Sequence, residues 1–350
     1  MQTQLLTRSA QLLDTVSGYD YVLVITHDNP DPDAIASGWS LKWLIERKLA
    51  IPTRLIGGGG IVRAENRQMV KLLGAPIELV QDFYHVDRTA AILVDCGYGS
   101  SNHLLADTGL RPVGVVDHHQ CGRQQARLPF KDLRKRVVAT ATIAGSYLRE
   151  QHLEPPQELA TALLYAIRTE TRGGGTWHSR LDRSIIFWLT RYADPTVLAE
   201  IENAPLPRDY YADVVLALQN AFIYDDAALC FLPRAEGAEL VGEVADLIIR
   251  CDEVRSVLCA AVVGEDLFLS VRTAQKTYNA ADLVQSGVCG LGHSGGHQQR
   301  SGGRIPKVAN GNANLEDLCD EVRTRWLAAC EVDRKRGTRL VAKREIVSNL

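Results

Sequence analysis

Six side chains that can bind a metal ion follow short apolar runs in the first half of the sequence. Each run is rich in Val, Ile and Leu, which is typical of a buried parallel strand. The carboxyl ends of parallel strands meet at one edge of a sheet, so we expect these imidazoles and carboxylates to gather there. The segments VLVITHDNPDPDAIAS, AAILVDCG and GVVDHHQ supply His27, Asp31, Asp33, Asp95, His118 and His119.

The spacing within the first segment favours a two-metal site. Asp31 and Asp33 are two residues apart and can face the same side, and His27 lies at the end of the apolar run. Carboxylates with imidazoles suit Mn²⁺, Mg²⁺ or Fe²⁺ better than structural zinc. Asp95 can bridge two ions roughly 3.5–4 Å apart, an arrangement that binds hydroxide and hydrolyses phosphate esters.

The alternative is that each aspartate only caps a helix or forms a turn, as single aspartates at strand ends usually do. Three polar groups in register make that interpretation less favourable, because clustered carboxylates without a cation are costly. Pro30 and Pro32 also fix the backbone around Asp31 and Asp33.

These segments resemble the motifs of the DHH phosphoesterases. Residues 27–37 are similar to the first motif, 95–97 to the second, and 117–119 to the triplet that names the family. The resemblance implies two Mn²⁺ ions, with Mg²⁺ or another divalent ion as alternatives. It implies that His27, Asp31 and Asp95 hold one metal, that Asp33, Asp95 and His118 hold the other, and that Asp95, Asp117 and His119 are catalytic, His119 being nearest the scissile phosphate.

The fourth motif of that family departs from its usual form in this chain. Where the family has an Asp after an apolar helix, LLYAIRTETRGG places Glu170. We expect Glu170 to ligate the second metal directly or through water, or to leave that site weaker. Equally open is that Glu170 caps a helix or pairs with Arg168 or Arg172.

The second half resembles the substrate-binding domain attached to nucleic-acid and nucleotide members of the family. The resemblance rests on FLSVRT, residues 268–273, and GHSGGHQQRSGG, residues 292–303. Glycines let backbone N–H groups approach an anion, and an arginine can hold a phosphate by two parallel hydrogen bonds. We expect this cradle to contain Arg272, His293, Gly295, Gly296 and His297. The alternative is an ordinary mobile loop.

Alternating helix and strand patterns up to about residue 190 predict an α/β fold with an N-terminal parallel sheet. A smaller mixed α/β domain is expected to follow, with the active site in the cleft between the two. We place the catalytic domain at 1–194, a helical linker at 195–215, the substrate-binding domain at 216–335 and a tail at 336–350. The strands ALCFL, VRSVLCAAVV and DLFLSVR and the helix VGEVADLIIR are predicted for the smaller domain.

Composition narrows the function classes. With 350 residues and 46% hydrophobic residues, the chain is typical of a two-domain enzyme. Its formal net charge of −3 argues against non-specific binding to long duplex nucleic acid. No apolar run is long enough to span a bilayer, and the N-terminus lacks the pattern of a secretory signal, so a cytoplasmic location is expected. The eight cysteines are scattered and are expected to act as small buried hydrophobes.

The predicted function is hydrolysis of short oligonucleotides, releasing mononucleotides, or of 3′,5′-bisphosphorylated adenosine, as the resemblance implies. Linear or cyclic dinucleotides are the alternative substrates. A second class of function is a catalytically weak nucleotide-binding protein, suggested by Glu170. The expected partner is a small nucleotide or short single-stranded RNA, and a homodimer is left open.

Overall fold

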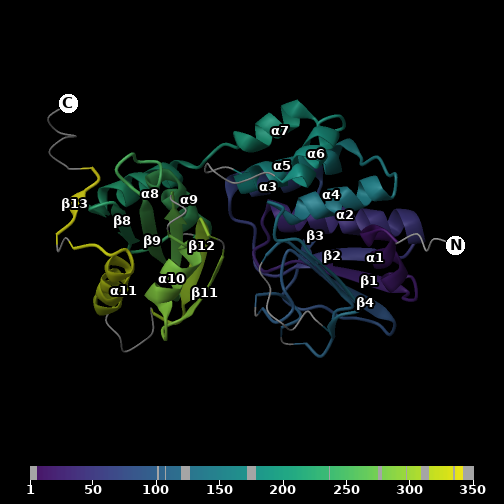
Figure 1. The fold of residues 1–350 in the computed structure, drawn as a ribbon, viewed down its shortest axis with the longest axis horizontal. Coiled ribbons are helices and arrows are strands. Elements are labelled where there is room, and N and C mark those ends of the chain that lie inside the picture. The colour runs from purple at the N-terminus through teal and green to yellow at the C-terminus, as the bar shows by residue number, and fades with distance from the viewer. Residues whose placement is uncertain are drawn as a thin grey trace. The chain divides into compact units, whose positions relative to one another are not determined.

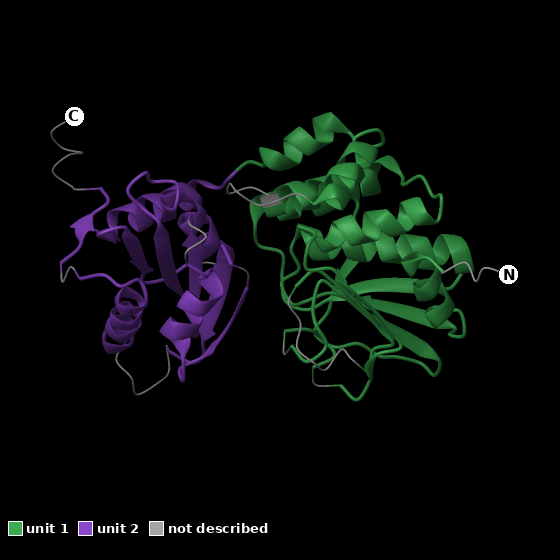
Figure 2. Cartoon of the chain, in the orientation of Figure 1, with its two compact units in different colours: residues 1–205 green, residues 206–350 purple. Residues whose placement is uncertain are grey.

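The structure is a computed structural model that describes residues 6–100, 102–106, 108–119, 127–171, 179–235, 237–274, 278–296, 298–308, 315–333 and 336–341. The chain divides into two compact units, residues 1–205 and residues 206–350 (Figure 2). No helix among the described residues is both long enough and apolar enough to cross a membrane.

The first unit is built on a six-stranded sheet in which every neighbouring pair is parallel. The strand order is β3-β2-β1-β4-β5-β6, so the chain moves outward on one side of β1 and then returns to its other side at β4. In parallel sheets, ligands bind at the carboxyl ends of the strands where the order reverses. The strands are β1 (Tyr21–Ile25), β2 (Thr53–Gly57), β3 (Ile77–Leu79), β4 (Thr89–Val94), β5 (Gly114–Asp117) and β6 (Phe130–Leu133).

The helices of the first unit pack on one face of this sheet. Side chains alternate along a strand, so Val22 and Val24 enter the helix-covered core while Leu23 and Ile25 enter a smaller core on the other face. That second core is completed largely by loop residues such as Phe83 and Leu105. Figure 1 shows α2, α4, α5 and α6 above the sheet and the loops below it. The helices are α1 (Arg8–Val16), α2 (Pro32–Leu49), α3 (Ala64–Leu73), α4 (Thr140–Glu150), α5 (Gln157–Thr171), α6 (Arg180–Leu189) and α7 (Pro195–Glu202).

The second unit contains a mixed sheet of seven strands in the order β11-β12-β10-β9-β8-β7-β13. Only the β8–β9 pair is parallel. One face packs on α10 and α11 and the other on α8 and α9. The elements are α8 (Arg208–Gln219), β7 (Ala221–Tyr224), β8 (Ala227–Leu232), α9 (Ala238–Ile248), β9 (Ser256–Val263), β10 (Asp266–Thr273), α10 (Ala280–Val288), β11 (His293–Gly296), β12 (Arg300–Ile305), α11 (Leu315–Ala329) and β13 (Thr338–Arg339).

Both parts of the predicted fold class, a parallel α/β sheet and a smaller mixed α/β sheet, are confirmed. The glycine-rich run in the second half is an antiparallel strand pair, β11 with β12, instead of a loop. A Cβ on Gly292 would lie 2.1 Å from the carbonyl oxygen of Arg304, so these glycines let the two strands approach closely. Of the described cysteines, Cys96, Cys230, Cys259 and Cys330 are buried, whereas Cys289 is exposed.

Candidate metal centre

The first predicted ligand segment leaves β1 and starts α2. Asp31 is the N-cap of α2, accepting a 3.0 Å hydrogen bond from the backbone N–H of Ala34, and Pro32 occupies the first turn. One carboxylate oxygen of Asp31 therefore does cap a helix, as the alternative interpretation expected. The positive end of the α2 dipole stabilises the negative charge of Asp31 and Asp33.

Asp33 lies at the starts of two helices at once. From the first turn of α2, its carboxylate accepts 2.7 Å hydrogen bonds from the backbone N–H groups of Thr140 and Ala141, which begin α4. The side chain is 1% exposed. Two helix N-termini thus converge on one buried carboxylate.

Asp95 directly follows β4 and has a left-handed backbone conformation, with φ of 57°. Asp tolerates this region better than most residues, and such conformations concentrate at functional sites. The backbone N–H of Asp95 donates to the carbonyl of Val116 at 3.0 Å, and its Oδ1 accepts a 2.7 Å hydrogen bond from Oγ1 of Thr140. Asp95 is therefore held once through its backbone and once through its carboxylate.

His27 and His118 both direct Nε2 toward the Asp95 carboxylate. Nδ1 of His27 lies 2.9 Å from the carbonyl of Asp28, and Nδ1 of His118 lies 3.4 Å from the carbonyl of Val137. A carbonyl only accepts, so a neutral ring that keeps its proton on Nδ1 presents Nε2 as a potential metal ligand, the arrangement typical of metal-binding histidines. Nε2 of His27 is 3.7 Å from Oδ2 of Asp95, and Nε2 of His118 is 3.7 Å from its Oδ1.

The potential ligand atoms form two groups that share Asp95. Within each group, the atoms lie within 4.8 Å of one another. The groups are His27, Asp31 and Asp95, and Asp95, His118 and His119. The first coincides with the set that the family resemblance implies, and the second has His119 where Asp33 was expected.

Asp33 is nevertheless close to the second group, because its Oδ2 lies 3.6 Å from Nε2 of His118. Both Asp33 oxygens also accept backbone N–H groups, so ligation has to use their remaining lone pairs. Glu170, near the end of α5, is close enough for its charge to raise the pKa of Asp33. Arg168, one of the partners considered for Glu170, forms an ion pair with Glu202 at 2.9 Å; Arg172 lies outside the described residues.

Asp117 and His119 form a pair beside these groups. The buried Asp117 accepts hydrogen bonds from both the backbone N–H and Nδ1 of His119, at 2.9 and 2.7 Å. Burial opposes charging of the imidazole, but the hydrogen bond and charge of Asp117 raise the pKa of His119 overall. His119 and Asp31 are the most exposed side chains of the centre, at 37% and 42%. A substrate can therefore reach the centre on the side of these two residues.

The pKa values of the centre reflect several carboxylates that are buried close together. Burial, followed by repulsion from neighbouring carboxylates, raises the pKa values of Asp33 and Asp95 well above their usual range. For His27, burial acts downward, but the hydrogen bond and charge of Asp31 raise the pKa to about 9. Burial raises the pKa of Asp31 less than its contacts with His27 lower it, to about 2. Divalent cations neutralise such a cluster, and its oxygen and imidazole donors fit Mn²⁺ or Mg²⁺.

The residues predicted to bind substrate lie in the second unit. The Arg272 guanidinium donates from Nε to Asp246 at 2.6 Å and from one terminal nitrogen to Ser270 at 2.7 Å. His293, Gly295 and Gly296 form β11, and His297 lies outside the described residues. Gly296 has a φ of 145°, and a Cβ there would lie 2.5 Å from Cα of Ser301, so only glycine fits.

Two contributors were missed at the sequence level. Thr140 was not among the predicted site residues, and its contact with Asp95 spans 45 positions in the sequence. His103 is 4% exposed and forms an isolated β-bridge with His27, in a loop after β4 that has no motif. The one indication that the sequence offered for Thr140 is its hydroxyl, a group that is common at helix starts.

The part of the chain that holds this centre is similar to a known family. Residues 21–167 match the DHH family, N-terminal domain. The match covers less than half of the chain, and Glu170 lies just beyond it.

Similar proteins extend over different parts of the chain. An uncharacterized protein of Methanocaldococcus jannaschii is 29% identical over 305 residues, covering 86% of this chain and 62% of that protein. A probable manganese-dependent inorganic pyrophosphatase of Streptococcus pyogenes is 25% identical over 164 residues, covering 43% of this chain and 48% of that protein. The chain thus spans less than two thirds of the length of these relatives.

Two solved structures share the fold. An exopolyphosphatase-related protein from Bacteroides fragilis superposes with a TM-score of 0.72 at 16% identity, covering 93% of this chain and 98% of that one. RecJ from Thermus thermophilus, solved in complex with Mn²⁺, gives a TM-score of 0.53 at 16% identity and covers 93% of this chain and 54% of RecJ. At this identity the likeness concerns the fold of the chain.

Proposed function

We propose that the protein is a metal-dependent phosphoesterase that hydrolyses short oligonucleotides, releasing mononucleotides, or 3′,5′-bisphosphorylated adenosine. One observation carries the proposal: the two carboxylate oxygens of Asp95 face Nε2 atoms of different imidazoles, His27 and His118, each at 3.7 Å. A carboxylate so placed is suited to bridge two cations. The manganese in the names of the pyrophosphatase relative and of the RecJ structure supports Mn²⁺ as the ion.

His27, Asp31 and Asp95 would hold one ion, and Asp95 and His118, with Asp33 or His119, the other. Divalent ions in such a site lower the pKa of water and neutralise charge on phosphoryl oxygens. Asp117 accepts the Nδ1–H hydrogen bond of His119, and when the imidazole is charged its Nε2 also carries a proton that it can donate to the phosphate. Its raised pKa favours the charged form, which stabilises negative charge developing on the phosphoryl group.

The proposed substrate class follows from the balance of charge and from the second unit. A net charge of −3 suits a short, locally bound substrate. We assign the second unit to substrate binding, through Arg272 and the strand pair that contains His293, Gly295 and Gly296, with His297 beside them in the sequence. The relatives' names make pyrophosphate and polyphosphate necessary members of any substrate panel.

Mn²⁺-dependent hydrolysis of a substrate panel tests the proposal. The panel contains short RNA, bisphosphorylated adenosine, linear and cyclic dinucleotides, pyrophosphate and polyphosphate. Turnover is expected with the first two, and Asp95→Ala is expected to lose far more than tenfold, because one carboxylate serves both ions. Activity of Asp95→Ala within about tenfold of the parent contradicts the two-metal mechanism. Tight nucleotide binding without turnover across the panel favours the alternative of a binding protein.

The role assigned to the second unit has its own test. Arg272→Ala is expected to raise KM for a nucleotide substrate strongly while sparing bis(p-nitrophenyl) phosphate, which engages only the metal centre. Because Arg272 also binds Asp246, a urea titration separates lost folding from lost recognition. Arg304→Ala, which removes an exposed cation from the neighbouring strand β12, serves as the matched control. Equal losses on both substrates contradict the assignment.

A further inference from the structure

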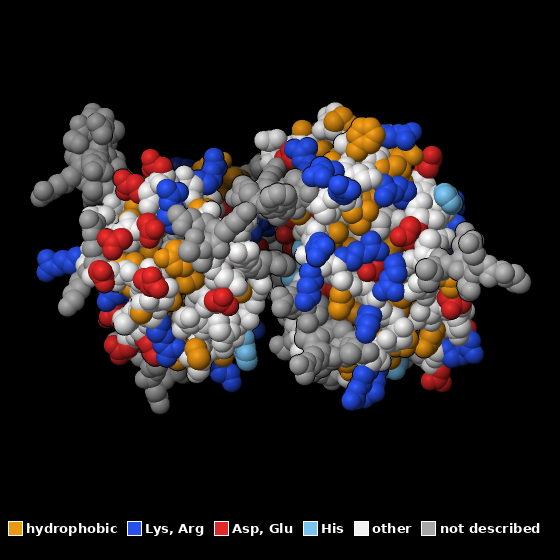
Figure 3. Space-filling model, in the orientation of Figure 1, with side chains coloured by type: hydrophobic (Ala, Val, Ile, Leu, Met, Phe, Trp, Pro, Cys, Tyr) orange, Lys and Arg blue, Asp and Glu red, His pale blue; other side chains and the backbone are white. Residues whose placement is uncertain are grey.

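The first unit has a cationic pocket beside the metal centre. A cavity of about 560 Å³ is lined by residues 133–137, which join β6 to α4, and residues 179–181 at the start of α6. Four of these residues are Arg or Lys and none is acidic. On the face drawn in Figure 3, Lys and Arg side chains gather on the first unit, whereas Asp and Glu side chains gather on the second.

Most of the positive charge in this pocket is uncompensated. Arg134 forms an ion pair with Asp132 at 2.7 Å and donates to Ser146. Lys135, Arg136 and Arg180 are exposed, and their side chains form no ion pair or hydrogen bond within the part of the chain that the structure describes. Cations that line one concavity repel each other and produce a positive potential, which an anion relieves.

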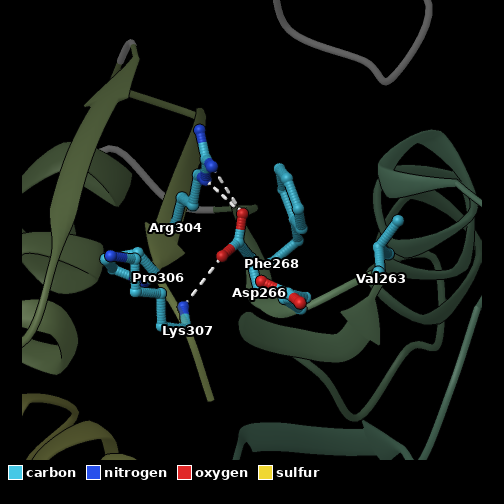
Figure 4. A pocket seen from close by; sticks show the side chains of 8 residues that line it. Val263, Asp266, Phe268, Arg304, Pro306 and Lys307 are labelled. Atoms are coloured by element: carbon cyan, nitrogen blue, oxygen red, sulfur yellow. Dashed lines mark hydrogen bonds and ion pairs between the residues drawn. The ribbon is translucent and has the colours of Figure 1, made fainter. Parts of the chain in front are cut away.

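In a second pocket, a carboxylate compensates the positive charge. In the second unit, a cavity of about 500 Å³ at the β9–β10 turn contains Arg304 and Lys307. The Arg304 guanidinium donates to Asp266 at 2.7 Å, and the same carboxylate accepts the backbone N–H of Lys307 (Figure 4). Arg304 also lies over the ring of Phe268. The charge of this pocket is largely balanced internally, so the pocket of the first unit is the stronger anion site.

The cationic pocket is tied to the metal centre by direct contacts. Leu133 pairs in register with Asp117, and the backbone N–H of Arg134 donates to the carbonyl of Asp117 at 3.0 Å. Val137, on the pocket wall, offers its carbonyl to Nδ1 of His118. The pocket therefore opens at the same carboxyl edge of the sheet as the metal-ligand candidates, one residue contact away from His118.

We propose that this pocket binds a phosphate group of the substrate other than the one that is cleaved. The proposal rests on the proposed function and deepens it: the preferred substrate carries several phosphates along a chain, and Lys135, Arg136 and Arg180 hold one that lies beyond the metal centre. Arginine binds phosphate oxygens through two parallel N–H groups, and lysine adds a mobile point charge. The phosphates can belong to a short single-stranded nucleic acid or to polyphosphate, which share this chemistry.

Binding without turnover provides the first test. A fluorescent single-stranded RNA of about five nucleotides is titrated with the full chain in EDTA at several salt concentrations. The triple variant Lys135→Ala, Arg136→Ala, Arg180→Ala is expected to bind at least about tenfold more weakly at low salt. It should also lower the slope of log K against log salt by about 2, because each contact with a single strand contributes about 0.7.

A control with the same loss of charge removes three cations at the opposite edge of the sheet. Lys48 and Lys71 end helices that run back toward the amino ends of the strands, and Arg111 precedes β5; all three are exposed. The variant Lys48→Ala, Lys71→Ala, Arg111→Ala is expected to keep the parent slope. Equal slopes for the two triple variants overturn the pocket assignment.

Two further arms separate the possible outcomes. Competition by polyphosphate of similar length identifies which phosphate chain the pocket binds. If the pocket variant binds only RNA more weakly than the parent does, the pocket is assigned to RNA. If it binds only polyphosphate more weakly, the pocket is assigned to polyphosphate. In kinetics with Mn²⁺, the pocket variant is expected to lose about tenfold in kcat/KM on the longer substrate and to retain the parent rate on bis(p-nitrophenyl) phosphate. A parent without any turnover contradicts the proposed function but leaves the binding slopes to decide the pocket.

Discussion

Thr140 donates a 2.7 Å hydrogen bond from Oγ1 to Oδ1 of Asp95. The two residues come from different elements, since Thr140 begins α4 and Asp95 follows β4. The same threonine also donates its backbone N–H to Asp33. One residue therefore positions two of the candidate ligand carboxylates, and the start of α4 is part of the metal centre.

Replacing that hydroxyl is expected to weaken metal binding. Thr140→Val keeps the shape but frees Asp95 to rotate, so the Mn²⁺ concentration at half-saturation should rise about 10- to 100-fold. Thr140→Ser should be much milder. Isothermal titration calorimetry measures the change, and Thr161→Val, which removes another buried hydroxyl from α5, should leave the metal affinity at the parent value. The same affinity in Thr140→Val as in the parent contradicts this role.

The stability of the metal-free protein is expected to fall as pH rises. The folded-state pKa of His27 is raised to about 9 from 6.5, so its contribution is complete below pH 6.5 and is lost as pH rises through 9. The raised pKa values of Asp33 and Asp95 act in the same direction. In EDTA, urea titrations should show a loss of up to about 3 kcal/mol over this range. His27→Gln or saturating Mn²⁺ should flatten the profile, and an equally steep profile in His27→Gln contradicts the assignment.

Asp182 should matter more for stability than an ordinary helix cap. It is fully buried and accepts hydrogen bonds from the N–H of Ser179 and Val138 and from the hydroxyl of Thr142. Asp182→Ala leaves these donors unsatisfied and is expected to cost about 2–4 kcal/mol of unfolding free energy. Asp194→Ala, at the N-cap of α7, should cost about 1 kcal/mol. Equal losses by chemical denaturation contradict the distinction.

Glu170→Gln distinguishes a ligand from a surface carboxylate. It keeps the size of Glu170 but removes the charge that acts on Asp33, so the Mn²⁺ requirement for half-maximal activity should rise several-fold. Glu170→Asp should be milder, because a carboxylate is retained. Glu158→Gln, an exposed position at the other end of α5, is the control. An unchanged metal requirement in Glu170→Gln means that Glu170 is not a ligand.

The strands that position the metal centre could be predicted because their sequences are continuously apolar. β1 and β4 are buried on both faces, so their runs read as strands, and the polar residues that follow fall at one edge. β6 was missed, since only Phe130 and Leu133 are apolar and its buried polar residue, Asp132, is satisfied by Arg134 and Tyr147. That compensation depends on tertiary contacts that no local pattern contains.

The same limit explains what was missed in the centre and in the second unit. Thr140 and the cationic pocket depend on where α4 and α6 begin relative to β5. The glycines of β11 and β12 have low intrinsic preference for strands, and their pairing is favoured by close approach to each other and to Val284 and Val288 of α10. The spacing of residues within a segment predicted which side chains could bind a metal. The orientation of those side chains depends on hydrogen-bond partners that are distant in the sequence.

The convergence of two helix starts on Asp33 also concerns the order of events during folding. The hydrogen bonds from Thr140 and Ala141 to Asp33 join positions 107 and 108 residues apart. Contacts of such long range form only after the intervening chain has been brought together, which slows folding. We therefore expect the buried carboxylates to be assembled late, when α4 docks beside α2, so that metal binding requires the folded domain and does not nucleate its folding.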